Sequence, residues 1–196
     1  MKKGKGQSSN LVKFIILSLL GTISLVLFFL NFPLPFLPPY LKIDFSEVPA
    51  LMASLIFSPI AGVIVIAIKN LLYLAVSGAG DPIGVAANFL AGIMFVVPVS
   101  IFYHRFKKGV KSVVSGLVTG TIVMTIGMSV LNYFFILPAY GWFMGWGDMT
   151  PEVIWASVIA AVLPFNVIKG IIVGFLFVPL FIKMRTWIEQ QQAKLA

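Results

Sequence analysis

Residues 82–111 of this chain read PIGVAANFLAGIMFVVPVSIFYHRFKKGVK. The first part, 82–103, is apolar over about 20 residues, the length that a helix needs to cross the hydrocarbon core of a bilayer. The second part, 104–111, holds a cluster of lysine and arginine residues. Because basic residues beside membrane spans collect on the cytoplasmic side, this stretch predicts a transmembrane helix whose second end faces the cytoplasm.

Six apolar stretches can be drawn along the whole chain, of which the second is short. They cover residues 11–31, 47–57, 59–77, 82–103, 112–137 and 155–183. With a cytoplasmic N-terminus, all 14 lysines and arginines lie inside except Lys42, Lys69 and Lys169, and all six acids except Glu189 lie outside. The sequence therefore predicts one all-α domain over residues 1–196, a six-helix transmembrane bundle. It would be a multi-pass protein of the cell (cytoplasmic) membrane, surrounded by lipid, with both termini in the cytoplasm.

Composition excludes several classes of function. Hydrophobic residues make up 60% of the chain and charged residues only 10%, whereas about a quarter of a soluble domain is charged. The net charge of +8 is explained by cytoplasmic loops that face anionic lipid, so no nucleic-acid partner is expected. The chain has no cysteine and no phosphate-binding loop, so it has no thiolate chemistry and does not hydrolyse ATP by itself. We expect neither an enzyme nor a bound cofactor or metal.

Residues 32–46, FPLPFLPPYLKIDFS, form an unusual apolar loop. Its prolines exclude an α-helix, and irregular backbone cannot lie in lipid with unsatisfied carbonyls, so the loop must pack on protein or cover a cavity. The helix that follows, 47–57, rises only about 17 Å, well short of the roughly 30 Å hydrocarbon core. The pattern predicts an apolar, proline-rich outer loop and a short second helix that together cap an outward-facing cavity. A re-entrant packing element is the alternative.

Polar side chains inside the predicted helices mark the candidate site, because such residues are costly in a membrane and usually functional. At 1.5 Å per residue, Asn88 lies about 9 Å and Asn132 about 8 Å below the outer surface. Asn166 and Lys169 are three residues apart and share one helix face. Amides both donate and accept hydrogen bonds, which suits a neutral ligand with several polar groups better than a bare ion. Alternatively, each asparagine makes a structural bond between helices.

The remaining charged residues have more than one interpretation. Asp44 and Glu47 lie where the loop and the short helix would close the cavity, and either could form an ion pair with Lys169. Lys69 is expected to lie outside the pocket, where it extends its amine toward the interface or pairs with an acid. His104 is interpreted as a residue of the cytoplasmic boundary, far from any partner for catalysis.

The first helix carries the small residues Ser18, Gly21 and Thr22. Such residues allow another helix to approach closely, either within this chain or in a partner protein.

With these features, the chain resembles a known family, the substrate-binding S components of energy-coupling factor (ECF) vitamin transporters. The resemblance is to their riboflavin-uptake members in particular. The six-helix layout carries the resemblance, together with four motifs. They are PLPFLPPYLKIDFSEVPALM at 33–52, DPIGVAANFLAG at 81–92, Asn132-Tyr133, and LPFNVIKG at 163–170.

The resemblance implies high-affinity capture of riboflavin from outside, with transport driven by a coupling transmembrane subunit and two ATPase subunits. In the family, the vitamin lies between the first outer loop and the outer halves of the fourth, fifth and sixth helices. The expected ligand-binding residues are Leu41, Asp44, Phe45, Glu47, Asn88, Asn132, Tyr133, Asn166 and Lys169. The family's Ala-x-x-x-Ala contact with the coupling subunit is replaced here by Ser18-x-x-x-Thr22, and Gly21 is assigned to the same surface. An S component or small transporter for another vitamin or solute is the alternative, and a small membrane enzyme or sensor is a further one.

Overall fold

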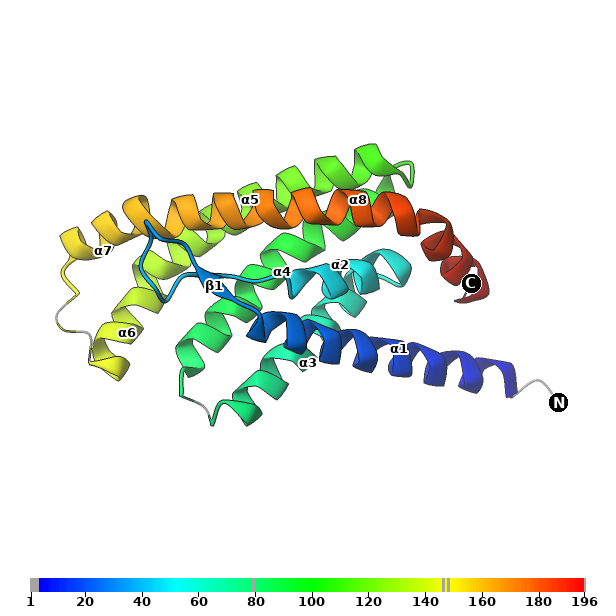
Figure 1. Ribbon diagram of the computed structural model, residues 1–196, viewed down its shortest axis with the longest axis horizontal. Coiled ribbons are helices and arrows are strands. Elements are labelled where there is room, and N and C mark those ends of the chain that lie inside the picture. Colours follow the sequence, from blue (N-terminus) through cyan, green and yellow to red (C-terminus); the bar gives the residue numbers. More distant parts are fainter. Residues whose placement is uncertain (1–3, 79, 146, 148, 196) are drawn as a thin grey trace.

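Long apolar helices lie alongside one another and form the body of the molecule (Figure 1). The computed structural model describes residues 4–78, 80–145, 147 and 149–195. Within these residues, five helical segments are long and apolar enough to cross a membrane. They are Asn10–Phe29, Pro59–Val76, Pro82–Arg105, Val110–Met144 and Pro151–Ala193, and Glu47–Ile56 is a sixth, shorter apolar helix. The predicted all-α architecture with a short second helix is confirmed.

Several elements extend beyond the predicted stretches or are interrupted within them. The helices are α1 (Gly4–Phe29), α2 (Glu47–Ile56), α3 (Pro59–Val76), α4 (Pro82–Arg105), α5 (Val110–Leu131), α6 (Leu137–Met144), α7 (Pro151–Ser157) and α8 (Leu163–Leu195). Two π-helical turns, η1 (Asn132–Ile136) and η2 (Val158–Val162), join α5 to α6 and α7 to α8. The fifth predicted helix therefore continues to Met144, and the sixth begins at Pro151 and continues to Leu195.

Local sequence explains where three of the helices begin. The side chains of Ser58, Asp81 and Thr150 each accept a hydrogen bond from a backbone N–H in the first turn that follows. A proline comes next in each case, at a position where its missing N–H costs no helical hydrogen bond. These starts are therefore fixed by side-chain chemistry as well as by packing.

Both π-helical turns stand just before a proline. Pro138 follows η1 and Pro164 follows η2, with one leucine between the turn and the proline in each case. A proline has no N–H to donate to the carbonyl four residues earlier, which is Phe134 or Ala160 and lies inside the turn. The wider turn accommodates this missing donor without ending the helix, so the predicted kink at Pro164 takes the form of a π-helical turn.

Helix α2 occupies the centre of the bundle, between α1, α3, α4 and α8 (Figure 1). All of its residues from Glu47 to Ile56 are buried. A helix of this length could not span a bilayer. Because α2 is enclosed by other helices, it is not required to cross the lipid. Its apolar side chains face protein on every side, and its polar first residue enters the site described below.

The proline-rich segment between α1 and α2 folds back on itself. Its ends pair as two short antiparallel strands, β1 (Phe32–Pro33) and β2 (Lys42–Ile43). Between the strands, the N–H of Leu37 donates to the carbonyl of Leu34 at 3.1 Å, and that of Leu41 to Pro38 at 2.9 Å. Paired strands and turns satisfy backbone groups that prolines exclude from a helix. The sequence predicted a loop here but not its hairpin form.

Helices α4 and α5 approach each other closely because α5 has glycines at the contact. A Cβ atom built on Gly120 would lie 2.5 Å from the carbonyl oxygen of Phe95, which belongs to the α4 backbone. One built on Gly174, by contrast, would meet only a methyl group of Leu117, at an ordinary 3.8 Å. Small residues of this kind are the usual basis of tight helix packing in membranes.

We therefore expect Gly120→Ala to destabilise the protein by about 1–3 kcal/mol, because the added methyl group must push two helix backbones apart. Thermal unfolding in detergent measures the effect, which should lower Tm by roughly 2–4 °C per kcal/mol for a chain of this size. Gly174→Ala is the matched control and should leave Tm nearly unchanged. Equal Tm values for the two variants would contradict this account of the α4–α5 contact.

Candidate functional site

A cavity of about 560 Å³ opens between the β1–β2 hairpin and helices α4, α5 and α8. Its wall combines aromatic rings, among them Tyr40, Tyr73 and Phe165, with the side chains of four asparagines. Those asparagines are Asn31, Asn88, Asn132 and Asn166. Pockets of this volume with a few polar groups on an apolar wall are typical of small-molecule sites.

Most of the predicted site residues meet at this cavity. Its lining includes Leu41, Asp44, Asn88, Asn132, Asn166 and Lys169. They come from segments far apart in the sequence: the hairpin, the first half of α4, the turn η1 and the start of α8. The structure thus brings together the loop and the helix halves that the sequence analysis combined.

Three predicted residues do not line the cavity. The ring of Phe45 lies 6.3 Å from that of Phe32, and Phe45 packs against the hydrophobic core. Tyr133 is adjacent to Asn132 but points elsewhere, and its ring makes edge contacts with Phe134 at 4.9 Å and Trp155 at 6.1 Å. Consecutive residues of a helical turn face different directions, and here the turn directs Asn132 to the cavity and Tyr133 to Phe134 and Trp155.

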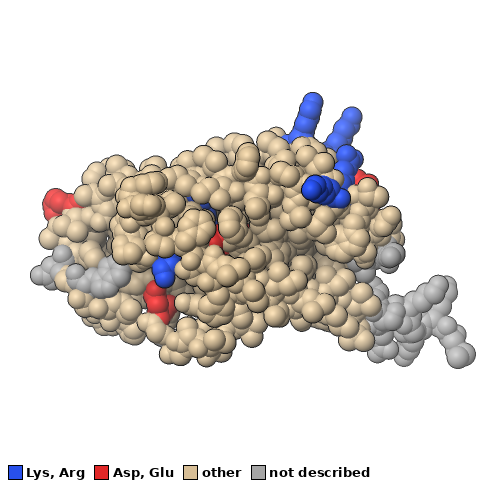
Figure 2. Space-filling model, in the orientation of Figure 1, with Lys and Arg blue, Asp and Glu red and all other residues tan. Residues whose placement is uncertain are grey.

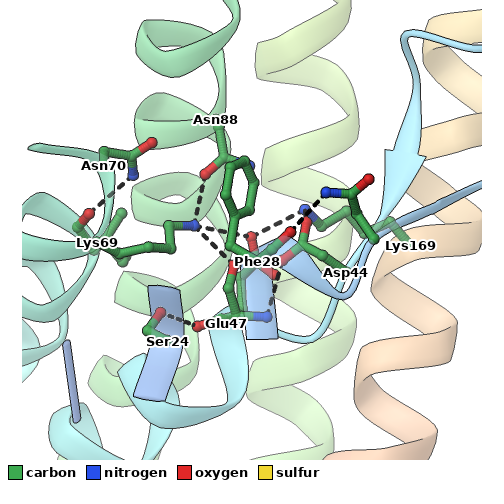
Figure 3. A network of polar contacts seen from close by, with 11 residues as sticks. Ser24, Phe28, Asp44, Glu47, Lys69, Asn70, Asn88 and Lys169 are labelled. Carbon is green, nitrogen blue, oxygen red and sulfur yellow. Dashed lines mark hydrogen bonds and ion pairs between the residues drawn. The ribbon is translucent and has the colours of Figure 1, made fainter. Parts of the chain in front are cut away.

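Glu47, the third of these residues, belongs to a buried ionic cluster at the edge of the cavity (Figure 3). Lys169 Nζ lies 3.1 Å from a carboxylate oxygen of Asp44 and 3.0 Å from one of Glu47. Lys69 Nζ lies 4.0 Å from the same oxygen of Glu47. All four side chains are buried, and the two lysines balance the two carboxylates. The predicted ion pair of Lys169 is therefore present, and it involves both acids.

Hydrogen bonds from Ser46 complete the surroundings of Asp44. The backbone N–H of Ser46 donates to a carboxylate oxygen of Asp44 at 2.9 Å, and the Ser46 hydroxyl donates to the same oxygen. Burial alone would raise the pKa of Asp44, but the charges of Lys169 and Lys69 and the two bonds from Ser46 lower the pKa below its usual range. Asp44 is therefore held as a carboxylate at the edge of the cavity.

Lys69 is connected to the site, although it does not line the cavity. Its side chain is only 1% exposed, so the prediction that it extends toward the interface is wrong. Its amine donates to Ser46 Oγ at 2.8 Å and to Asn88 Oδ1 at 2.6 Å (Figure 3). The sequence offered pairing with an acid as the other interpretation, which its proximity to Glu47 supports. Nothing in the sequence indicated the contact with Asn88.

The asparagines of α5–α6 and α8 share one local arrangement. Asn132 Nδ2 donates to the carbonyl of Met128, and Asn166 Nδ2 donates to that of Val162, each at 2.8 Å. Both bonds stay within one helix, so neither amide nitrogen serves as a bridge between helices. Within the part of the chain that the structure describes, no hydrogen bond to either amide oxygen is found, so each is available as an acceptor.

Sequence reasoning missed several residues of the wall because their helices were predicted to end too early or to face elsewhere. Tyr140 lies on α6, beyond the predicted end of the fifth helix, and its hydroxyl lies 3.0 and 2.9 Å from the two carboxylate oxygens of Asp81. Asp81 also caps α4 by accepting from the N–H of Gly84 at 2.7 Å. A continuation of apolar character past Pro138 was the signal that could have placed Tyr140 on a helix.

The small residues of α1 divide between two surfaces. Ser18 and Thr22 are exposed. Gly21 is buried, and a Cβ atom on it would lie 2.5 Å from a methyl group of Ile68 in α3. Gly21 therefore belongs to internal packing, and its predicted place on a partner surface is corrected.

His104 lies at the end of α4 and is engaged in packing. Its Nε2 atom lies 2.9 Å from the carbonyl oxygen of Ser54 in α2. Within the described part of the chain, no group of three or more histidines and acids is placed to hold a metal ion. The arrangement is that of a cavity lined by amides and aromatic rings, with a neutralised ionic cluster at its edge.

Comparison with known proteins agrees with this description. The chain is 46% identical over 183 residues to the protein named riboflavin transporter FmnP of Bacillus subtilis, covering 92% of this chain and 96% of that protein. It is 43% identical to the riboflavin transporter RibU of Staphylococcus aureus, covering 91% of this chain and 93% of the relative.

A solved structure, described as the S component of a bacterial ECF transporter, superposes with a TM-score of 0.77 at 44% identity, covering 91% of this chain and 98% of that one. The model of the family "ECF transporter, substrate-specific component" matches residues 12–181. The chain therefore belongs to the family of ECF transporter substrate-specific components.

Proposed function

We propose that this chain captures riboflavin for an ECF-type vitamin uptake transporter. The observation that carries the proposal is the cavity between the β1–β2 hairpin and helices α4, α5 and α8, in which asparagine amides face aromatic rings. Two relatives that are 43% and 46% identical over nearly the whole chain are named riboflavin transporters. The cavity chemistry and these relatives point to the same ligand.

The chemistry of riboflavin matches this wall. Its flat isoalloxazine ring offers a large apolar surface, while its carbonyl oxygens, ring nitrogens and ribityl hydroxyls need hydrogen-bond partners. Tyr40, Tyr73 and Phe165 supply rings along the wall, and Asn132 and Asn166 supply acceptors. A volume of about 560 Å³ is within the range of pockets that enclose ligands of this size.

Charge balance also favours a neutral ligand. Lys69 and Lys169 are compensated by Asp44 and Glu47 within the buried cluster. A net charge would draw an ion of opposite sign, whereas a neutral cluster leaves recognition to amides and shape. We therefore assign Leu41, Asp44, Asn88, Asn132, Asn166 and Lys169 to the riboflavin site, with Glu47 supporting Lys169.

We further propose that both termini face the cytoplasm and that the cavity opens to the outside. Figure 2 shows lysine and arginine side chains gathered at one end of the molecule. Exposed basic residues there come from the α4–α5 connection and the last part of α8, whereas Asp81 lies at the opposite end of α4. This distribution supports an orientation that follows the positive-inside rule.

Partner subunits belong to the same proposal. A capture protein that concentrates its ligand needs an energy source, which for an ECF transporter would be a coupling transmembrane subunit and two ATPase subunits. The exposed face of α1 that carries Ser18 and Thr22 is our candidate for the contact with the coupling subunit.

We expect the purified protein to bind one riboflavin per chain without ATP or metal, because the cavity is already formed. Titration in detergent, followed by quenching of flavin fluorescence, should saturate near one equivalent. Well-folded protein that shows no quenching at micromolar riboflavin would contradict the proposed ligand.

Asn166→Ala and Asn132→Ala should each weaken riboflavin binding by about tenfold, the loss expected when a buried polar group of the ligand loses its partner. Asn70→Ala is the matched control. Asn70 is also buried and donates to a carbonyl four residues earlier, that of Ile66 at 2.9 Å, but it does not line the cavity. If Asn70→Ala reduced affinity as strongly at equal thermal stability, the asparagine wall would not be the binding surface.

Ser18→Leu should reduce transport while leaving binding intact, because a bulky side chain there blocks approach of a partner helix without entering this protein's core. Uptake of labelled riboflavin by cells with the complete transporter, compared with binding by the purified variant, separates the two effects. Gly21→Leu is the contrasting change and should lower Tm, because Ile68 occupies the space. Normal uptake by Ser18→Leu would remove this face from the proposed contact.

A further inference from the structure

We propose that Lys69 is a positioning residue for ligand recognition. It fixes the Asn88 amide so that its nitrogen, and not its oxygen, faces the cavity and donates to an acceptor atom of the ligand. The inference rests on the proposed function for the identity of the ligand. It assigns a role in the binding reaction to a lysine that lies behind the cavity wall and is not part of its surface.

The surroundings of the Lys69 amine leave it little freedom. Nζ donates to Ser46 Oγ at 2.8 Å and to Asn88 Oδ1 at 2.6 Å, and it lies 4.9 Å from the centre of the Phe28 ring. These partners come from the loop before α2, from α4 and from α1. The side chain is 1% exposed. An ammonium group held from three directions in a buried site has essentially one position.

The chemistry of the ammonium group decides the orientation of the amide. A lysine amine has three N–H donors and no acceptor, whereas an asparagine amide has one acceptor oxygen and one donor nitrogen. Turning the Asn88 amide by half a rotation would place its NH₂ group against the ammonium, donor against donor. Lys69 therefore selects the orientation in which the amide oxygen faces the ammonium, and it disfavours the reversed one. Figure 3 shows the Asn88 oxygen directed at Lys69.

The Asn88 nitrogen is left for the ligand. Asn88 lines the cavity, and among the described residues no hydrogen bond from its Nδ2 atom is found. Asn132 and Asn166 differ, since one N–H of each amide is bound to its own helix and, among the described residues, no hydrogen bond to either amide oxygen is found. The cavity thus presents a donor from α4 and acceptors from η1 and α8. The group that meets Asn88 must be an acceptor such as a carbonyl oxygen or an unprotonated ring nitrogen, both of which isoalloxazine carries.

The experiment is a double-mutant cycle in which riboflavin affinity and Tm are measured together in detergent. The proteins are the wild type, Lys69→Met, Asn88→Ala and the double variant. If Lys69 acts through Asn88, each single change weakens binding by about tenfold, and Lys69→Met weakens it less than about twofold when Asn88 is already alanine. A purely structural role would reduce affinity by the same factor in both backgrounds, and that result would overturn the inference. The inference would also be overturned if Lys69→Met bound riboflavin with the affinity of the wild type.

A second pair of variants separates the amide orientation from the loss of a buried charge. Lys69→Met leaves the cluster with an extra negative charge, which by itself could unfold the protein. Adding Glu47→Gln restores neutrality, since Asp44 and Lys169 still balance each other. We expect Lys69→Met/Glu47→Gln to fold and to bind about tenfold more weakly than both the wild type, whose cluster is also neutral, and Glu47→Gln alone. Recovery of full affinity in the double variant would show that charge, and not the amide, was responsible.

Asn88→Asp tests the donor directly. The substituted carboxylate keeps an acceptor for Lys69 but has no N–H for the ligand. We expect its affinity to fall as far as that of Asn88→Ala, and Tm measured alongside reports the cost of the extra buried negative charge. Binding equal to the wild type would contradict the assignment of a donor to this position.

The wild-type titration distinguishes failure of the proposed riboflavin-binding function from failure of the proposed role of Lys69. If the wild type does not bind riboflavin, the proposed function fails and the inference fails with it. If the wild type binds and the cycle is additive, only the role of Lys69 is overturned.

Ser100→Ala is the control for general destabilisation. It removes a buried bond to the carbonyl of Ser54 about 18 Å along α4 from Asn88. It should affect Tm alone.

Discussion

The structure depends on four charges that are buried together, those of Asp44, Glu47, Lys69 and Lys169. Each would be strongly unfavourable alone in the apolar interior, because the cost of removing an ion from water is offset only by close partners. The partners come from the hairpin, α2, α3 and α8. Satisfying them therefore fixes how the loop lies on the bundle and where the short central helix begins. The same cluster forms one edge of the cavity (Figure 3), so the requirement for charge neutrality also shapes the site.

A second constraint comes from proline in the long helices. Pro138 and Pro164 each remove a backbone donor, and a π-helical turn precedes both. Asn132 begins one of these turns, and Asn166 follows Pro164 in α8. A π-helical turn changes the direction of the side chains on either side of it. The interruptions therefore help to aim both amides at one space.

Two layers of side chains can be distinguished at the cavity, those that line it and those that contact the lining residues from behind. Amides and aromatic rings form the cavity wall, while Lys69 and Ser46 hold the polar groups behind it in place. Ser24 of α1 extends this support, because its hydroxyl donates to the carbonyl of Ser46 at 2.6 Å. The hairpin, α1 and α3 are thus connected through hydrogen bonds around a single serine. Because these side chains are already fixed, less conformational entropy is lost when a ligand binds to the site.

Sequence alone determined the all-α membrane architecture, the short second helix and six of the residues that line the cavity. Apolar length and charge asymmetry report directly on the bilayer, and isolated asparagines in apolar helices stand out against their neighbours. Tertiary structure decided what sequence could not, namely which way each side chain faces. Tyr133 and Phe45 do not line the cavity, Gly21 packs inside, and Tyr140 reaches the wall because α6 continues past a proline. The hydrogen bond from Lys69 to Asn88 joins α3 to α4. It forms only when both helices have the right rotation about their axes, and that rotation is set by packing against all the neighbouring helices.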